Sequence, residues 1–269
     1  MKKYCLHTHT KRCGHAIGED EEYIQQAINE GFDVYGYSDH VMFLNVSQRR
    51  IRGDFSMLKD YLDSINKIKE KYKNQIEIHI GFEAEYFKEF TDFYRFLNLT
   101  KKIEYLILGQ HFYFQEDMIK NFGLLGSSGA LVKYANCLIE GIKTGLFSIV
   151  AHPDLFIYWY EQKDELFYEY INKIIDTVIE MDVALELNIS KITNLKKAGS
   201  SSPKEEACFP VDEFWKLVAK KGAKVVVGLD CHCVEAVSAE DFEYGINLAR
   251  QYGLNLVDID SVINKFTKI

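Results

Sequence analysis

The chain has 269 residues, of which 47% are hydrophobic and 27% charged, enough apolar material for the core of one large domain or two small ones. Its formal net charge of −8 argues against long nucleic acids as partners, because binding a polyanion requires a basic surface. No apolar run is long enough to span a membrane, and residues 1–20 lack the apolar core of a signal peptide. We therefore expect a cytoplasmic protein with no membrane partner.

Short apolar runs alternate with longer helical patterns from one end of the chain to the other. Seven runs are rich in Val, Ile, Leu and aromatic residues, as is typical of strands buried on both faces, and they cover residues 4–9, 33–40, 76–83, 104–111, 147–152, 183–188 and 224–232. Helical patterns occupy residues 21–30, 57–72, 128–143, 165–180, 212–221 and 235–252. This alternation predicts parallel strands joined by crossover helices. We expect an α/β fold of the seven-stranded (β/α) barrel type, with a doubly wound open sheet as the alternative.

Seven of the eight histidines and two carboxylates lie at or beside the carboxyl ends of the predicted strands. In chain order they are His7, His9, His15, His40, Glu83, His111, His152, Asp230 and His232. The carboxyl ends of parallel strands form one rim, where active sites are built, and residues two apart on a strand point to the same side. The set therefore predicts a metal site at that rim. The remaining histidine, His79, lies deeper on the third strand, and we interpret it as a hydrogen-bonded interior residue.

The order of these motifs resembles the PHP (polymerase and histidinol phosphatase) superfamily. The resemblance extends from residue 4 to about residue 255 and is carried by His7-Thr8-His9, His15, Asp39-His40, Gly81-Phe82-Glu83, His111, His152-Pro153-Asp154 and Asp230-Cys231-His232. The segment Leu185–Asn188, LELN, and the closing VVVGLDCH look most like the stand-alone histidinol-phosphatase branch. The resemblance implies a distorted seven-stranded TIM-like barrel with a trinuclear metal centre. The whole of 1–269 would then be a single PHP-type metal-dependent phosphoesterase domain.

The same resemblance implies how the ligands are shared among three metal ions. One ion would be held by His7, His9, Glu83 and Asp230. A second would be held by His111, His152 and a bridging Glu83, and the third by His15, His40 and His232. Mixed imidazole and carboxylate donors suit zinc, iron or manganese.

A centre of this kind indicates phosphoester chemistry. Three divalent ions among two carboxylates and seven neutral imidazoles leave an excess of positive charge, which suits a phosphate monoester dianion. We expect a phosphoric monoester hydrolase in which a metal-bound hydroxide attacks phosphorus directly, with catalytic roles for Glu83, Asp230 and His232. The expected substrate is histidinol phosphate, from histidine biosynthesis, and the alternative is another small phosphomonoester or a nucleotide. An amidohydrolase also opens with HxH but relies on a lysine ligand, and no lysine ends the fourth strand here.

Basic residues in the loops after the strands are candidates for contacting the substrate. Arg12, between His9 and His15, is the leading candidate, followed by Lys191 and Lys197 after the sixth strand. Further basic residues in such loops are Arg49, Arg50, Arg52 and Lys196, for most of which ordinary surface charge is the alternative. The chain departs from the histidinol-phosphatase branch after His152, where HPDLFIYWY contains no basic residue.

Three further carboxylates lie close in sequence to predicted ligands. They are Asp39, Glu85 and Asp154. We expect them either to orient the ligand histidines by hydrogen bonds or to serve as solvated or helix-capping groups.

Overall fold

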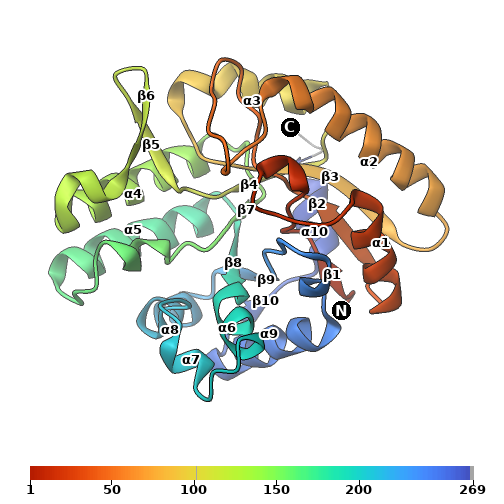
Figure 1. Cartoon of the computed structure of the whole chain (residues 1–269). Helices are drawn as coiled ribbons and strands as arrows, with labels where there is room; N and C mark the ends of the chain where they lie inside the picture. The colour runs from red at the N-terminus through yellow and green to blue at the C-terminus, as the bar shows by residue number, and fades with distance from the viewer. Residues whose placement is uncertain (101, 267–269) are drawn as a thin grey trace.

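The computed structural model describes residues 1–100 and 102–266, which form a curled parallel sheet surrounded by helices (Figure 1). The sheet has the strand order β1-β2-β3-β4-β7-β8-β9-β10. Its strands are Tyr4–Cys5 (β1), Val34–Tyr37 (β2), Glu77–Ala84 (β3), Tyr105–Leu108 (β4), Ile149–Val150 (β7), Ala184–Asn188 (β8), Lys224–Gly228 (β9) and Asn255–Leu256 (β10). The predicted distorted TIM-like barrel is confirmed, with eight parallel strands instead of seven, because the two residues of β10 pair with the start of β9.

The helices cover the outside of the sheet, as crossover connections between parallel strands require. All six predicted helices are present, as Asp20–Asn29 (α1), Leu58–Tyr72 (α2), Gly126–Lys143 (α4), Glu165–Glu180 (α5), Asp212–Lys221 (α8) and Ala239–Tyr252 (α9). The structure adds Thr91–Leu99 (α3), Ser190–Lys197 (α6), Pro203–Glu206 (α7) and Ile259–Phe266 (α10). It also adds an antiparallel hairpin of Phe112–Gln115 (β5) and Met118–Asn121 (β6). Within the described residues, no helix combines the length and apolarity needed to cross a membrane.

The segments that follow β1 and β9 meet at the carboxyl end of the sheet. The amide of His9 donates to the carbonyl of Cys231 (2.9 Å), and the amide of Cys231 donates to the carbonyl of His7 (3.0 Å). This parallel pairing continues β1 and β9 beyond their named ends and joins opposite margins of the sheet. The histidine pair of the first strand therefore lies beside Asp230 and His232.

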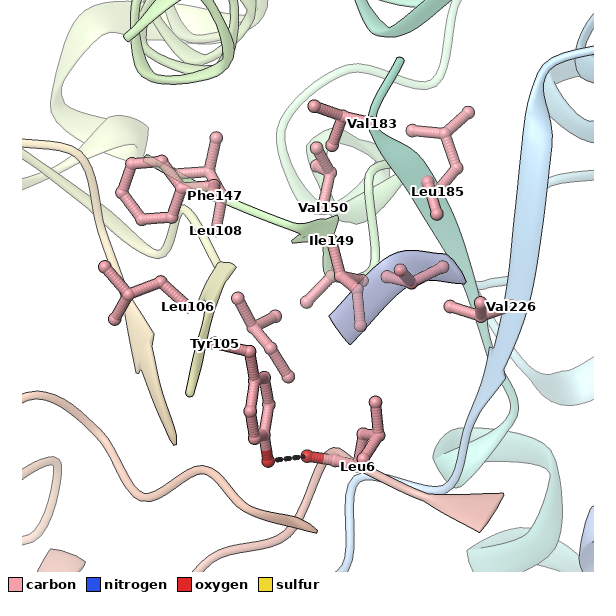
Figure 2. Packing of buried hydrophobic residues seen from close by; sticks show 14 of the residues in the cluster. Leu6, Tyr105, Leu106, Leu108, Phe147, Ile149, Val150, Val183, Leu185 and Val226 are labelled. Carbon is pink, nitrogen blue, oxygen red and sulfur yellow. Dashed lines mark hydrogen bonds between the residues drawn. The ribbon is translucent and has the colours of Figure 1, made fainter. Parts of the chain in front are cut away.

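Large apolar side chains fill the centre of the sheet (Figure 2). Every residue of β4 is buried, as expected for a strand covered on both faces. The hydroxyl of Tyr105 donates to the carbonyls of Leu6 (2.7 Å) and Tyr37 (3.0 Å), so its polar end is satisfied within the core. Gly36 makes room for this ring, since a Cβ at that position would lie 2.3 Å from the hydroxyl oxygen. The core thus fixes the strands whose ends carry the predicted ligands.

Candidate metal centre

The structure brings all nine predicted metal ligands together at the carboxyl rim. They come from the ends of six strands and the loops that follow, although they are spread from residue 7 to residue 232 in the sequence. Eight of them line one pocket of about 290 Å³, namely His9, His15, His40, Glu83, His111, His152, Asp230 and His232. The ninth, His7, is buried directly behind the pocket, against Glu83 and Asp230.

Four donor atoms at the carboxyl ends of β1, β3 and β9 form a compact group. The Nε2 atom of His7 lies 3.4 Å from Oε2 of Glu83 and 3.5 Å from Oδ1 of Asp230. The Nε2 atom of His9 lies 3.5 Å and 3.3 Å from the same two oxygens. Four ligands at 2.0–2.2 Å around a tetrahedral ion lie about 3.3–3.6 Å from one another. The spacing therefore fits a bound divalent metal.

The protonation of His7 supports the same reading. Its Nδ1 lies 2.8 Å from a carboxylate oxygen of Glu186, so Nδ1 carries the proton and donates it. The lone pair of Nε2 then faces two carboxylate oxygens, and within residues 1–100 and 102–266 Nε2 has no hydrogen-bond partner. Three acceptors that converge in a buried place are stabilised by a cation between them. The residues present therefore fit a metal ion.

Glu83 connects this group to a second one. Its Oε1 lies 3.0 Å from Nε2 of His152 and 3.5 Å from Nε2 of His111, while its Oε2 lies 3.1 Å from Nδ1 of His40. Gly109 makes room for the carboxylate, since a Cβ there would lie 1.9 Å from Oε1 of Glu83. Glu83 can therefore offer one oxygen to each of two ions.

A third group of imidazoles lies on the open side of the pocket. The Nε2 atoms of His15 and His232 are 2.9 Å apart, and the ring of His232 stacks on the ring of His9 with 4.2 Å between centroids. Donor atoms of His9, His40 and His232 also lie close enough to share one ion. His15 is exposed, whereas His9 and His40 are buried, so this group forms the mouth of the pocket.

The electrostatics of the pocket are those of a cation site. Burial lowers the pKa of His7, but Glu186, Asp230 and Glu83 outweigh it and hold that pKa well above its usual value. Burial likewise opposes, without cancelling, the charge of the histidines around Glu83, whose pKa lies well below its ordinary value. Both shifts show that positive charge is favoured between these groups.

On the side of the pocket formed by His40 and His232, the pKa values of the histidines are lowered. Burial, with the charge of His9 adding to it, lowers the pKa of His232 to about 4. Burial also lowers the pKa of His40 well below its ordinary value. Neutral imidazoles with free lone pairs are the form that binds a metal.

Two candidate ligands have unusual backbone conformations. His152 has φ of 30° and Asp230 has φ of 50°, both in the left-handed region that residues with a Cβ rarely adopt. Such conformations cost about 1–2 kcal/mol per residue and gather at ligand sites, where the surrounding structure holds them.

Carboxylates outside the pocket hold two of the histidines in place. Glu186 on β8 contacts Nδ1 of His7 and also accepts from the amide of Asn188 (2.8 Å). Gly228 on β9 makes room for it, because a Cβ there would lie 1.8 Å from its Oε1. Glu85 lies 3.2 Å from Nδ1 of His111 and binds Arg52 with both oxygens.

The other two flanking carboxylates have different surroundings. Asp39 accepts from Thr10 and from the amide of His40 (2.9 Å), and one oxygen lies 3.8 Å from Nδ1 of His9. Asp154 accepts from the amide of Val211 (2.7 Å) and from the indole of Trp215 (2.9 Å). Asp154 therefore anchors the start of α8, and among the described residues it has no hydrogen bond to a histidine.

The basic residues that the sequence favoured as substrate contacts lie outside the pocket lining. Arg12 binds Asp20 with both terminal nitrogens (2.8 and 2.9 Å) and donates to Asp60 through Nε (2.9 Å). Lys197 pairs with Asp241 at 2.9 Å. Lys191 lies half-buried on α6, and the pocket lining includes none of the three. Their role toward the substrate stays a prediction.

Three residues at the site were not singled out from the sequence. Glu186 lies within the LELN segment, and its position on a strand two residues before a carboxyl end is the signal that could have found it. Ile51 and Phe112 line the pocket from the segments that follow β2 and β4. Nothing in the sequence distinguishes these two apolar residues from the many that lie in the core, so their position in the pocket lining could not be predicted.

Fold and site together define an α/β-barrel protein with a cluster of metal-binding side chains at the carboxyl rim. Residues 6–190 match the model of the PHP domain, so the chain belongs to the PHP domain family. The match ends before Asp230 and His232, which the structure nevertheless places beside the matched ligands.

Histidinol-phosphatases are among the proteins that this chain is similar to. The chain is 24% identical over 233 residues to a probable histidinol-phosphatase of Deinococcus radiodurans, covering 84% of this chain and 85% of that protein. It is 28% identical over 101 residues to the histidinol-phosphatase of Bacillus subtilis, covering 34% and 37% of the two chains. The fold is shared with the histidinol phosphate phosphatase of Lactococcus lactis, whose crystal structure contains zinc, L-histidinol and phosphate. That comparison has a TM-score of 0.73 with 16% identity and covers 95% of each chain.

Proposed function

We propose that the chain is a metal-dependent phosphoric monoester hydrolase with histidinol phosphate as its leading substrate. The observation that carries the proposal is the group formed by His7, His9, Glu83 and Asp230, whose donor atoms are spaced as around one divalent ion. Membership of the PHP domain family and the named relatives support the reaction class.

We propose that the nine clustered side chains bind three divalent ions, which are zinc, iron or manganese. When bound, such ions polarise the phosphoryl oxygens and lower the pKa of a coordinated water. Glu83, with an oxygen toward each neighbouring group, would bridge two of them.

The protein's own groups prepare the site in specific ways. Glu186 and Glu85 accept the Nδ1 protons of His7 and His111, which leaves each Nε2 free to face the pocket. Asp230 accepts from Asn188 (3.3 Å) and Ser190 (3.4 Å) through Oδ2, so its Oδ1 is directed toward His7 and His9. These contacts fix donor atoms before any ligand arrives, and preorganisation of that kind is what transition-state stabilisation requires.

The proposed catalytic groups are Glu83, Asp230 and His232. They line the pocket, and His232 is the most exposed of them, with 32% of its side chain accessible. It is therefore placed to contact a phosphoryl group that enters from solvent.

A second substrate class is favoured by one feature of the chain. The segment after His152 holds no basic residue before Lys163, and Tyr158 is the exposed large side chain there. Small phosphomonoesters or nucleotides therefore remain the alternative to histidinol phosphate. The pocket of about 290 Å³ suits a small substrate in either case.

The test is hydrolysis by the purified protein loaded separately with zinc, manganese or iron(II), measured as phosphate release from monoesters and by chromatography of the products from a dinucleotide. Histidinol phosphate, p-nitrophenyl phosphate, a nucleoside monophosphate and a dinucleotide form the panel. We expect release from monoesters, highest with histidinol phosphate, and loss of release on chelation. Hydrolysis of the dinucleotide alone, or none by any metal-loaded form, would overturn the proposal.

A further inference from the structure

Arg50 is the one basic residue in the lining of the metal pocket, as far as the described residues go. Arg12 and Arg52 direct their guanidinium groups to carboxylates, as described above. Arg50, in contrast, forms no ion pair with any side chain of residues 1–100 and 102–266, and it is exposed. A guanidinium beside a metal pocket and without a carboxylate partner is available to an anion.

The backbone at Arg50 is held in an uncommon conformation. Its φ of 68° lies in the left-handed region, which residues with a Cβ rarely adopt. Gly14 packs against it so closely that a Cβ there would lie 3.2 Å from the backbone of Arg50. Strain of this kind persists only where surrounding contacts enforce it.

Arg52 supplies the enforcing contacts. Its side chain is fully buried, and it donates to the carbonyl of Val41 (3.1 Å) and to Oε1 of Gln48 (2.6 Å), which ties the two ends of the loop together. Its Nη2 binds both oxygens of Glu85 (2.9 and 2.8 Å). Because Glu85 also holds Nδ1 of His111, one carboxylate anchors both a candidate metal ligand and the loop that carries Arg50.

We propose that Arg50 contacts the non-bridging oxygens of the phosphoryl group in the metal pocket. We assign Arg52 as the positioning residue that places the Arg50 loop and His111 relative to each other. This assignment rests on the proposed function and deepens it. The planar guanidinium matches two phosphate oxygens at once, and it keeps its charge at every pH at which the enzyme could work.

Arg49 offers a matched control beside Arg50. Both arginines are exposed and both line a larger adjoining groove of about 790 Å³, but only Arg50 also lines the metal pocket. Neutralising either residue removes the same charge from the same loop. If the phosphate Kd of R50Q differs from that of R49Q, the difference indicates direct contact of Arg50 with phosphate and excludes a general effect of the loop's charge.

The experiment measures binding of inorganic phosphate to the metal-loaded protein by calorimetry, together with KM for histidinol phosphate and p-nitrophenyl phosphate. We expect R50Q to raise the phosphate Kd and both KM values about tenfold or more, R50K to fall between R50Q and the parent, and R49Q to stay within about twofold. Equal Kd values for R50Q and R49Q would overturn the contact.

Arg52 is tested with R52K, which keeps the charge but loses the planar fork. We expect the phosphate Kd to rise about fivefold or more at a temperature where circular dichroism shows the variant folded. A lowered Tm with an unchanged phosphate Kd would reduce Arg52 to a structural residue. If the parent protein releases phosphate while R50Q behaves like R49Q, this inference alone fails. If the parent releases none from any monoester, the proposed function fails whatever Arg50 does.

Discussion

Glu186 lies outside the pocket, yet its carboxylate determines which nitrogen of His7 faces the candidate metal position. It is almost fully buried, with Gly228 leaving the space that its oxygen occupies. Replacing the carboxylate with an amide would leave one weaker, uncharged acceptor for the Nδ1 proton and add an NH2 donor, so the imidazole could adopt either tautomer.

We therefore expect Glu186→Gln to weaken metal binding by about tenfold to a hundredfold, the usual cost of losing such a partner. Competition with a chromophoric chelator measures the affinity. Glu205→Gln, the same substitution at an exposed position on α7, should change nothing. Unaltered metal affinity in E186Q would show that Glu186 does not orient His7.

At single residues, the sequence predicted some features and missed others for identifiable reasons. The histidine and carboxylate cluster could be predicted because strand ends are visible in the hydrophobic pattern and parallel strands share one rim. The two partners of Arg12 could not be predicted. Asp20 and Asp60 come close to Arg12 only after α1 and α2 have packed. Contacts that depend on helix packing leave no signal in local spacing.

Among the elements, the segment Lys11–Cys13 is fixed to α1 and α2 by Arg12. The side chain of Arg12 is 8% exposed and that of Asp20 is 7% exposed, so the pair is largely shielded from water. The hydroxyl of Ser64 on α2 also donates to Asp20 (2.6 Å).

We expect Arg12→Gln to lower the free energy of unfolding by about 3 kcal/mol, because it leaves a buried carboxylate without its partner. KM should stay within about twofold, since Arg12 is absent from the lining of the metal pocket. Urea unfolding and steady-state kinetics measure the two effects. Lys11→Gln, at an exposed ion pair, serves as control. A raised KM without loss of stability would instead support Arg12 as a substrate contact.

Glu104 joins β3 and α2 at the opposite end of the sheet. Its carboxylate accepts from Nζ of Lys69 (2.6 and 2.7 Å) and from the amide of Ile80 (2.9 Å), while Nδ1 of His79 lies 3.5 Å away. Burial alone would raise its pKa, but His79 and Lys69 outweigh burial and lower the pKa to about 2. His79 also contacts Glu77 (2.9 Å), as expected of a hydrogen-bonded residue outside the site.

Because the folded pKa of Glu104 lies below the unfolded value of 4.5, its contribution is complete above that pH and disappears as the pH falls toward 2. We expect Glu104→Gln to destabilise the protein by about 1–3 kcal/mol at pH 7 and by less at pH 3.5. Urea unfolding at both pH values measures the difference, with Glu161→Gln at an exposed position as control. If the difference in unfolding free energy between the parent protein and E104Q is as large at pH 3.5 as at pH 7, the lowered pKa of Glu104 is contradicted.

Two of the elements that sequence analysis missed, α6 and β10, have weak periodic patterns. The helix α6 has the sequence SKITNLKK and buries only two side chains, Ile192 and Thr193. The strand β10 has two residues, too short for a detectable alternation. The long amphipathic helices were predicted because five buried residues of α2, for example, recur at helical spacing.

At the scale of the whole molecule, the candidate centre joins strands from every part of the sheet. A ligand that binds only the folded state stabilises it, by about 2.7 kcal/mol at a hundred times its Kd. For a chain of this size each kcal/mol shifts Tm by about 2–4 °C. Chelation should therefore lower Tm by about 5–10 °C, and zinc or manganese should restore it.

Differential scanning calorimetry with elemental analysis measures this effect. The substitution Asp230→Asn should lower the metal content, because it removes one of the two carboxylates from the group that His7 and His9 share with Glu83. A chelated protein with unchanged Tm and no detectable metal before treatment would count against the centre. The barrel itself should survive chelation, since its large buried hydrophobic cluster contains none of the nine candidate ligands.

The pairing of Cys231 with the end of β1 has a consequence for the order of events during synthesis. On the ribosome, His7 and His9 emerge more than two hundred residues before Asp230 and His232. The nascent chain thus holds three of the four donors of the group formed by His7, His9, Glu83 and Asp230, and it cannot complete the group until the residues that follow β9 leave the exit tunnel. Stable binding of an ion by this group consequently has to wait until Asp230 has emerged.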